Sequence, residues 1–131
     1  MTDRVLLSVP AKSEYARTVR LAAASLATRV GMVFERVEDV RIAAEEAFVF
    51  VSDRAPEDSP VDVAFEVDES GVALEIGPVP AAALEDEDAL QRAEFARFIL
   101  EAVCDELDLA SGPAQCRVRL TLKAQAEAPG A

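Results

Sequence analysis

The chain has 131 residues, of which 51% are hydrophobic, and its formal net charge at pH 7 is −12. That length predicts one domain with a real core, and the negative charge disfavours nucleic acid as a partner and favours a basic protein surface, although acidity can also serve solubility alone. The absence of His excludes His-based catalytic triads and His metal sites. No apolar run approaches the ~20 residues of a membrane span and no signal-peptide pattern is present, so we expect a cytoplasmic protein whose Cys104 and Cys116 stay reduced.

The first half of the chain predicts a strand, two helices and a hairpin. Residues 4–9 are short and apolar and are closed by a proline, as a strand would be. Apolar residues then recur every three or four positions in 13–30 and in 34–54, which predicts two amphipathic helices. Strict alternation in 61–67 and 72–76, on either side of a turn, predicts a β-hairpin with one buried face.

The second half predicts one more helix and a second hairpin. After a loop at 77–88 that carries two prolines and an acidic run, residues 88–105 predict a helix. On the inner side of this helix we expect Phe95, Phe98, Ile99, Ala102 and Val103. Residues 107–109 begin the last hairpin, which turns at 111–113 and returns along 116–123.

Each predicted helix has one apolar stripe and each predicted strand has one apolar face. Elements of this kind bury their apolar sides best when the helices cover one face of a sheet. We therefore predict an α/β (α+β) two-layer sandwich, with a mixed, largely antiparallel sheet and about three helices on one face. Residues 1–124 form this single domain, and the Ala-, Pro- and Gly-rich segment 125–131 is predicted to be a disordered tail.

Several local strings, in their order and spacing, resemble those of a known family. They are the opening strand that ends at Pro10, Val19-Arg20-Leu21, Val40-Arg41-Ile42-Ala43-Ala44-Glu45-Glu46-Ala47, Asp105-Glu106-Leu107-Asp108-Leu109 and the final strand that ends at Lys123. Over roughly residues 4–123 the chain resembles the anti-sigma-factor serine kinases of the RsbW and SpoIIAB type, in the histidine-kinase-like ATPase superfamily. The resemblance implies that superfamily's fold, in which nucleotide is held between helices and a flexible lid.

The resemblance also implies a function and a partner surface. Active members bind ATP with magnesium, phosphorylate a serine on an anti-anti-sigma protein, and bind a sigma factor, usually as dimers. Arg20 stands where family members use the first helix to contact their protein partner. An arginine fork is a common interface anchor, and the competing interpretation is an ordinary surface residue.

The family's magnesium motif is Glu-x-x-x-Asn on the second helix, where the Glu activates the attacking hydroxyl and the Asn ligates magnesium. Residues four apart share one helix face. Here Glu46 matches the Glu, but Phe50 stands at the Asn position, and a phenyl ring has no oxygen for a hard cation. We therefore predict that Phe50 fills the phosphate space and that Glu46 is vestigial; a plainer interpretation makes Glu46 an exposed helical acid beside Glu45.

The family's two glycine-containing motifs are altered as well. In the Asp-x-Gly-x-Gly motif the Asp binds the adenine amino group, and here Gly77 or Pro78 takes its place, depending on the alignment. In the Gly-Leu-Gly-Leu lid motif, Glu94 and Ala96 replace the glycines, and we expect Glu94 to direct negative charge towards the phosphates. No Gly-rich P-loop elsewhere in the chain compensates for these changes.

These observations predict a catalytically degenerate, anti-sigma-like regulator of transcription. We expect it to bind a sigma factor, an anti-anti-sigma protein or an active paralogue, as a homodimer and without a cofactor. One alternative is a divergent serine kinase that still uses ATP and magnesium to phosphorylate an anti-anti-sigma protein. A second alternative is an unrelated α/β interaction module that shares only the order of its elements.

Overall fold

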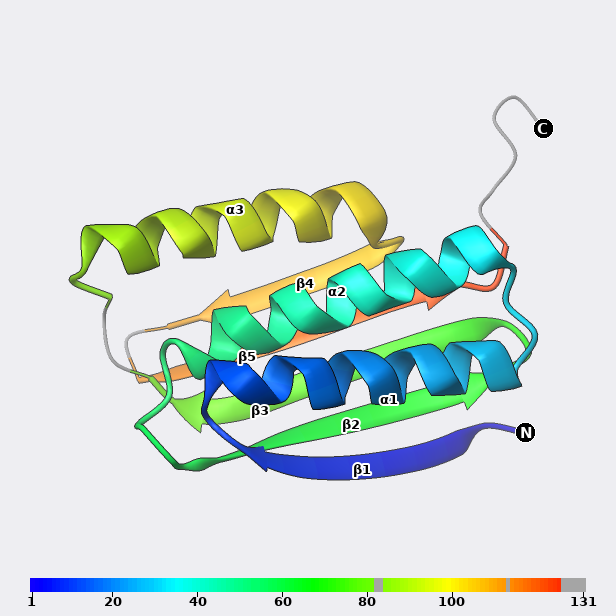
Figure 1. Ribbon diagram of the computed structural model, residues 1–131, viewed down its shortest axis with the longest axis horizontal. Coiled ribbons are helices and arrows are strands. Elements are labelled where there is room, and N and C mark those ends of the chain that lie inside the picture. Colours follow the sequence, from blue (N-terminus) through cyan, green and yellow to red (C-terminus); the bar gives the residue numbers. More distant parts are fainter. Residues whose placement is uncertain (82–83, 113, 126–131) are drawn as a thin grey trace.

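The computed structural model describes residues 1–81, 84–112 and 114–125, and within them three α-helices pack on a five-stranded sheet (Figure 1). The elements in chain order are β1 (Asp3–Pro10), a 3₁₀-helix (Ser13–Tyr15), α1 (Ala16–Arg29), α2 (Phe34–Ser52), β2 (Pro60–Asp68), β3 (Gly71–Pro80), α3 (Glu87–Val103), β4 (Glu106–Ser111) and β5 (Gln115–Lys123). The predicted order of strands and helices is confirmed. Part of the turn predicted at 111–113 and most of the tail predicted at 125–131 lie outside the described residues.

The sheet has the strand order β1-β2-β3-β5-β4, and each of its four pairings in the described residues is antiparallel. The predicted sheet, mixed but largely antiparallel, is thus antiparallel throughout this part of the chain. Its alternating sequence fixes the register: on β2, Val61, Val63 and Phe65 are fully buried, whereas Asp62 and Glu66 are exposed. A slip of one residue would exchange these two sets, so the pattern specifies which face meets the helices.

All three helices lie on one face of the sheet, with α1 and α3 on either side of α2 (Figure 1). α2 is the central helix, and it packs against both of its neighbours. Ala44, Ala47, Phe48 and Val51 of α2 are fully buried towards the core. The predicted two-layer sandwich with helices on one face is confirmed. No α-helix in the described part of the chain is long and apolar enough to cross a membrane.

The burial pattern of α3 differs from the predicted one. Its buried residues are Ala89, Ala93, Ala96 and Leu100. Phe95 and Phe98 are 60% and 69% exposed, and Ala102 is exposed as well, so their predicted inward orientation was wrong. Ile99 and Val103 are partly buried. A stripe of alanines allows close approach of helix backbones, and it leaves the larger phenyl rings on the solvent side.

Candidate functional site

Glu46 and Phe50 are four residues apart on α2 and therefore share one side of that helix. Phe50 is only 2% exposed, and the guanidinium carbon of Arg54 lies 4.7 Å from the centroid of its ring, within the range of a cation–π contact. Arg54 Nη1 also donates to the Ser111 hydroxyl at 2.8 Å, which links the end of α2 to β4. A buried aromatic ring covered by a cation thus stands where the family resemblance implies a magnesium ligand.

Glu46 is half-buried rather than fully exposed. Burial raises the pKa of its carboxyl group, and the neighbouring charge of Glu45 raises it further. A carboxylate with a raised pKa is a better proton acceptor, which is the property that a general base needs. No group of three or more Cys, Asp or Glu side chains in the described residues is arranged so that it could hold a metal ion.

Gly77 and Pro78 interrupt β3 at a point where its pairing with β5 shifts register. Gly77 has a φ of 91°, and a Cβ at this position would lie 2.8 Å from the carbonyl oxygen of Cys116, so the backbone requires glycine here. Together with the exposed Leu6, both residues line a hollow in the sheet surface. Neither residue has a side-chain acceptor for an adenine amino group.

On α3, Glu94 and Ala96 have different surroundings. Ala96 is fully buried in the helix layer, whereas Glu94 lies on the exposed side of the helix. Asp86 is the N-cap residue of α3, and one of its carboxylate oxygens accepts a hydrogen bond from the Asp88 amide at 3.4 Å. A helix N-terminus of this kind could attract an anion, but here an aspartate already satisfies one of its amides.

The family model of the histidine kinase-like ATPase domain matches residues 9–122, a range that includes Glu46, Phe50 and the positions of the two altered glycine motifs. The chain belongs to this family. Among its relatives, the serine-protein kinase RsbW of Listeria innocua is 27% identical over 128 residues, which cover 83% of this chain and 80% of that protein. RsbW of Listeria monocytogenes is 28% identical with the same coverage. RsbW of Halalkalibacterium halodurans is 40% identical over 53 residues, 40% of this chain and 33% of that protein.

In this histidine kinase-like ATPase domain, Arg20 lies between α1 and α2. Its Nη1 is 3.4 Å from a carboxylate oxygen of Glu45, and 26% of its side chain is exposed. Its Nε is buried without a hydrogen-bond partner among the described residues. Arg20 therefore connects the two helices and still presents part of its side chain to solvent, a position that is compatible with either interpretation given above.

A second arginine, which the sequence did not single out, joins α2 to the strands at the other end of the domain. The side chain of Arg36 is 10% exposed and forms ion pairs with Asp39 at 3.0 Å and Asp105 at 2.6 Å. Its Nε donates to the carbonyl oxygen of Lys123 at 3.1 Å, and the Lys123 amide donates to Asp105 at 2.7 Å. Asp105, the first residue of a string that resembles the family, is thus a structural residue here.

Cys104 lies beside this arginine network. Burial, and then the negative charge of Asp105, raise the pKa of the Cys104 thiol to about 12. A thiol that stays protonated at neutral pH is a poor nucleophile and a poor metal ligand. Cys104 and Cys116, which the sequence predicted to stay reduced, are both free thiols in the structure.

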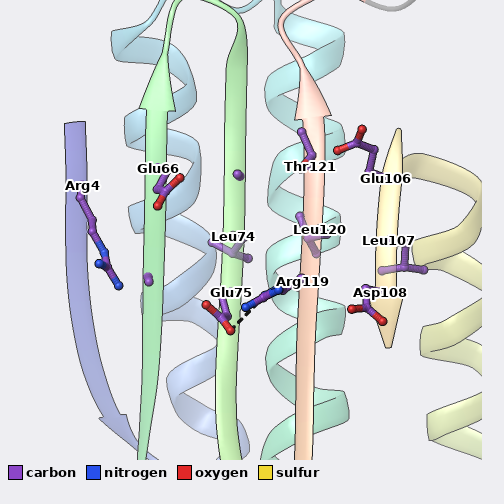
Figure 2. Close-up of a pocket in the computed structure, with 12 residues that line it drawn as sticks. Arg4, Glu66, Leu74, Glu75, Glu106, Leu107, Asp108, Arg119, Leu120 and Thr121 are labelled. Atoms are coloured by element: carbon purple, nitrogen blue, oxygen red, sulfur yellow. Dashed lines mark hydrogen bonds and ion pairs between the residues drawn. The ribbon is translucent and has the colours of Figure 1, made fainter. Parts of the chain in front are cut away.

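The opposite face of the sheet carries a shallow pocket of about 440 Å³. Figure 2 shows its side chains, with Glu75 and Arg119 directed towards each other across β3 and β5 and joined by an ion pair of 3.2 Å. Arg4 reaches it from β1, and Asp108 borders it on β4. This pocket lies on the side of the sheet away from the helices, so it is separate from the site of Glu46 and Phe50.

Proposed function

We propose that this chain is a partner-binding regulator of the anti-sigma type and that it acts without phosphoryl transfer. The observation that carries the proposal is the burial of Phe50 beneath Arg54, at the position where the resemblance requires a magnesium ligand. Full burial of a phenylalanine side chain contributes about 1.5–3 kcal/mol to folding. Nucleotide could enter this space only if the ring moved into water, and binding would then have to offset that loss.

The other two motif positions also fit Mg-ATP poorly. Gly77 and Pro78 offer no side-chain acceptor, and Glu94 and Ala96 stand in place of the lid glycines. The N-terminus of α3 already carries the negative charge of Asp86, its N-cap residue. The loss of one hydrogen bond to a charged group costs about 1.5–3 kcal/mol, and each 1.4 kcal/mol is roughly a tenfold change in affinity. Two such losses convert micromolar affinity into roughly millimolar affinity. We therefore assign no step of a mechanism to ATP or magnesium.

The proposed partners are a sigma factor, an anti-anti-sigma protein or an active paralogue. Two observations support them: relatives that match most of this chain are named serine-protein kinase RsbW, and the chain keeps the family's fold. A net charge of −12 favours a basic partner surface, because opposite fields speed encounter and suppress wrong partners. We propose contact through α1 around Arg20, and association of the chain as a homodimer.

A binding assay with the sigma factors, anti-anti-sigma proteins and paralogues of the same host tests this proposal. We expect a stoichiometric complex that forms without nucleotide. Arg20→Ala should weaken it by about 1–2 kcal/mol if Arg20 is an anchor, and the exposed Arg17→Ala on the same helix is the matched control. Loss of the ion pair to Glu45 should change stability by less than about 1 kcal/mol. If none of these proteins binds, the proposal is wrong.

A divergent serine kinase is the second candidate, and two observations favour it. The raised pKa of Glu46 suits a general base, and a hollow of about 430 Å³ at the end of α2 is lined by Arg54 and by Pro80 and Leu84. In that hollow, Arg54 could contact a phosphate through altered geometry. Transfer of labelled phosphate from ATP to an anti-anti-sigma protein, abolished by Glu46→Gln, would establish this candidate and overturn the first.

A further inference from the structure

We propose that the outer side of α3 binds a basic amphipathic helix of a partner protein. The surface, named here the α3 outer face, is defined by Leu90, Glu94, Phe95, Phe98 and Glu101. It is separate from the surface around Arg20, because α2 lies between α1 and α3 (Figure 1). The proposal goes beyond the function proposed above and does not depend on it.

The α3 outer face exposes two aromatic rings on one helix. Phe95 and Phe98 are three residues apart, so they lie on neighbouring positions of the same side, and each keeps more than half of its surface in water. Leu90 is exposed as well, about two turns before Phe98 and nearer the start of the helix. Single exposed apolar residues are ordinary, but several on one surface mark an interaction site. Burial of both rings by a partner would contribute substantially to binding.

A groove continues this surface towards the edge of the sheet. It has a volume of about 400 Å³ and lies between α3 and β4, which run side by side in Figure 1. Leu107 and Leu109 of β4 contribute apolar surface and are only partly buried. Glu101 borders the groove and also belongs to the α3 outer face. Since β4 is an edge strand, no further strand in the described part of the chain lies beyond it on this side of the groove.

The charges around the rings determine which kind of partner fits. Glu94 and Glu101 flank the rings, and Glu87 and Asp88 begin the helix. Of the two arginines on α3, Arg92 is paired with Asp53 of the loop after α2 at 3.2 Å. The other, Arg97, is exposed and borders the groove, where Glu101 and Asp105 also lie, so acids outnumber the one remaining cation. The face is therefore acidic and aromatic, and its complement is apolar and basic.

A helix is the partner element that matches this geometry. Apolar side chains at spacings of three, four and seven residues can pack on the rings and reach into the groove, while Lys and Arg between them meet the glutamates. A second copy of this chain fits less well, because it would bring Glu94 and Glu101 against the same acids.

The test uses the full chain and two synthetic helical peptides that share one pattern of leucines. The polar positions are all Lys in one peptide and all Glu in the other. We expect saturable 1:1 binding of the Lys peptide by fluorescence anisotropy, at least about tenfold tighter than the Glu peptide and weaker as salt rises. Phe95→Ala combined with Phe98→Ala should weaken the Lys peptide by about tenfold or more.

Two control variants distinguish specific binding at this surface from nonspecific hydrophobic and electrostatic binding of the peptide. Phe34→Ala removes a ring that is 74% exposed at the start of α2, so it should leave the affinity for the Lys peptide unchanged. Glu94→Gln combined with Glu101→Gln should reduce the salt dependence of binding. Because all four residues on α3 are exposed, these variants should unfold at the midpoint of the unchanged chain.

Four results would overturn the proposal. They are equal binding of the two peptides, an equal loss in Phe34→Ala, the absence of saturable binding, and a dimer in sedimentation that the double Phe variant dissociates. The last result would show that a second copy occupies the face. None of them affects the assay with sigma factors and Arg20→Ala, so failure here and failure of the proposed function remain distinguishable.

Discussion

Arg36 lies in the first turn of α2 and Arg54 two residues beyond its last residue, and the domain holds the two side chains in different ways. Arg36 has a carboxylate, a second carboxylate and a backbone carbonyl oxygen as partners, at distances of 2.6 to 3.1 Å. Within the described residues, Arg54 donates a hydrogen bond to Ser111 and stacks on Phe50. Its Nε is buried without a partner in the described residues. One end of the helix is thus held by a satisfied ionic network, and the other by an aromatic contact.

The difference separates the scaffold from the site. The network of Arg36 ties α2 to Asp105, which precedes β4, and to the end of β5, so it fixes the helix layer on the sheet. Buried charge is tolerable there because each group has partners. At the other end, an apolar ring stands where the family resemblance implies a polar ligand, and it adds core burial. The family's fold is thus held by the Arg36 network, which is remote from Phe50, and this is compatible with the proposed regulator that acts by binding.

The largest effect is expected at the aromatic end. Phe50→Ala should lower the free energy of unfolding by about 4 kcal/mol, because it removes a buried ring and leaves a cavity. Phe50→Leu keeps most of the apolar volume and should cost less than about 1.5 kcal/mol. Urea unfolding measures both, with Phe34→Ala as the exposed control. A loss below about 1 kcal/mol for Phe50→Ala would mean that the ring is not part of the core.

Substitution of Arg36, at the start of α2, should lower the free energy of unfolding almost as much. Arg36→Ala leaves Asp39 and Asp105 without their partner, and we expect a loss of about 3 kcal/mol, at the lower end for a broken buried pair because both aspartates are partly exposed. The matched variant Arg54→Ala should cost only about 1 kcal/mol. Unfolding curves for the two variants test the comparison directly. Equal losses would show that the two arginines are not held differently.

The smallest effect is a pH dependence at Glu46. Its folded-state pKa is raised above the ordinary value of 4.5 by burial and by Glu45. The stability from this group is therefore complete below that value and is lost as the pH rises through the folded pKa. Glu46→Gln should be more stable than the unchanged chain at neutral pH and equal to it near pH 4. Urea unfolding at neutral pH and near pH 4 measures the difference, with Glu57→Gln as an exposed loop control. A gain in stability for Glu46→Gln that persisted near pH 4 would contradict this prediction.

The strands were predictable because apolar and polar residues alternate strictly along them, a pattern that fits only a strand with one buried face. Val61, Val63 and Phe65 point one way and their polar neighbours point the other, and the register follows. The buried side of α3 was not predictable in this way, since two stripes compete along the same helix. One contains Phe95 and Phe98 and looks more hydrophobic; the other contains Ala93 and Ala96 and packs more closely. Contact with α2 decides between them, and a single sequence does not contain that contact.

The candidate site was predictable only in part. The motif position of Phe50 could be read from the family resemblance, and its burial follows from its apolar character. The roles of Arg36 and Arg54 could not, because an arginine on a helix usually indicates a solvated side chain. Arg36 finds Asp105, 69 residues further along the chain. The acidic string that begins at Asp105 was a signal of the family, but nothing in it indicated which cation it would meet.

A calorimetric titration of Mg-ATP tests the central claim most directly. The unchanged chain, Phe50→Asn and the RsbW of Listeria innocua, which is named as a serine-protein kinase, would be titrated under the same conditions. The account predicts no saturable heat at micromolar nucleotide for the unchanged chain. It also predicts none for Phe50→Asn, because Gly77 and Pro78 still lack a side-chain acceptor and Glu94 and Ala96 still replace the lid glycines. Saturable micromolar binding of Mg-ATP by the unchanged chain, with stabilisation that rises with nucleotide concentration as linkage demands, would contradict it.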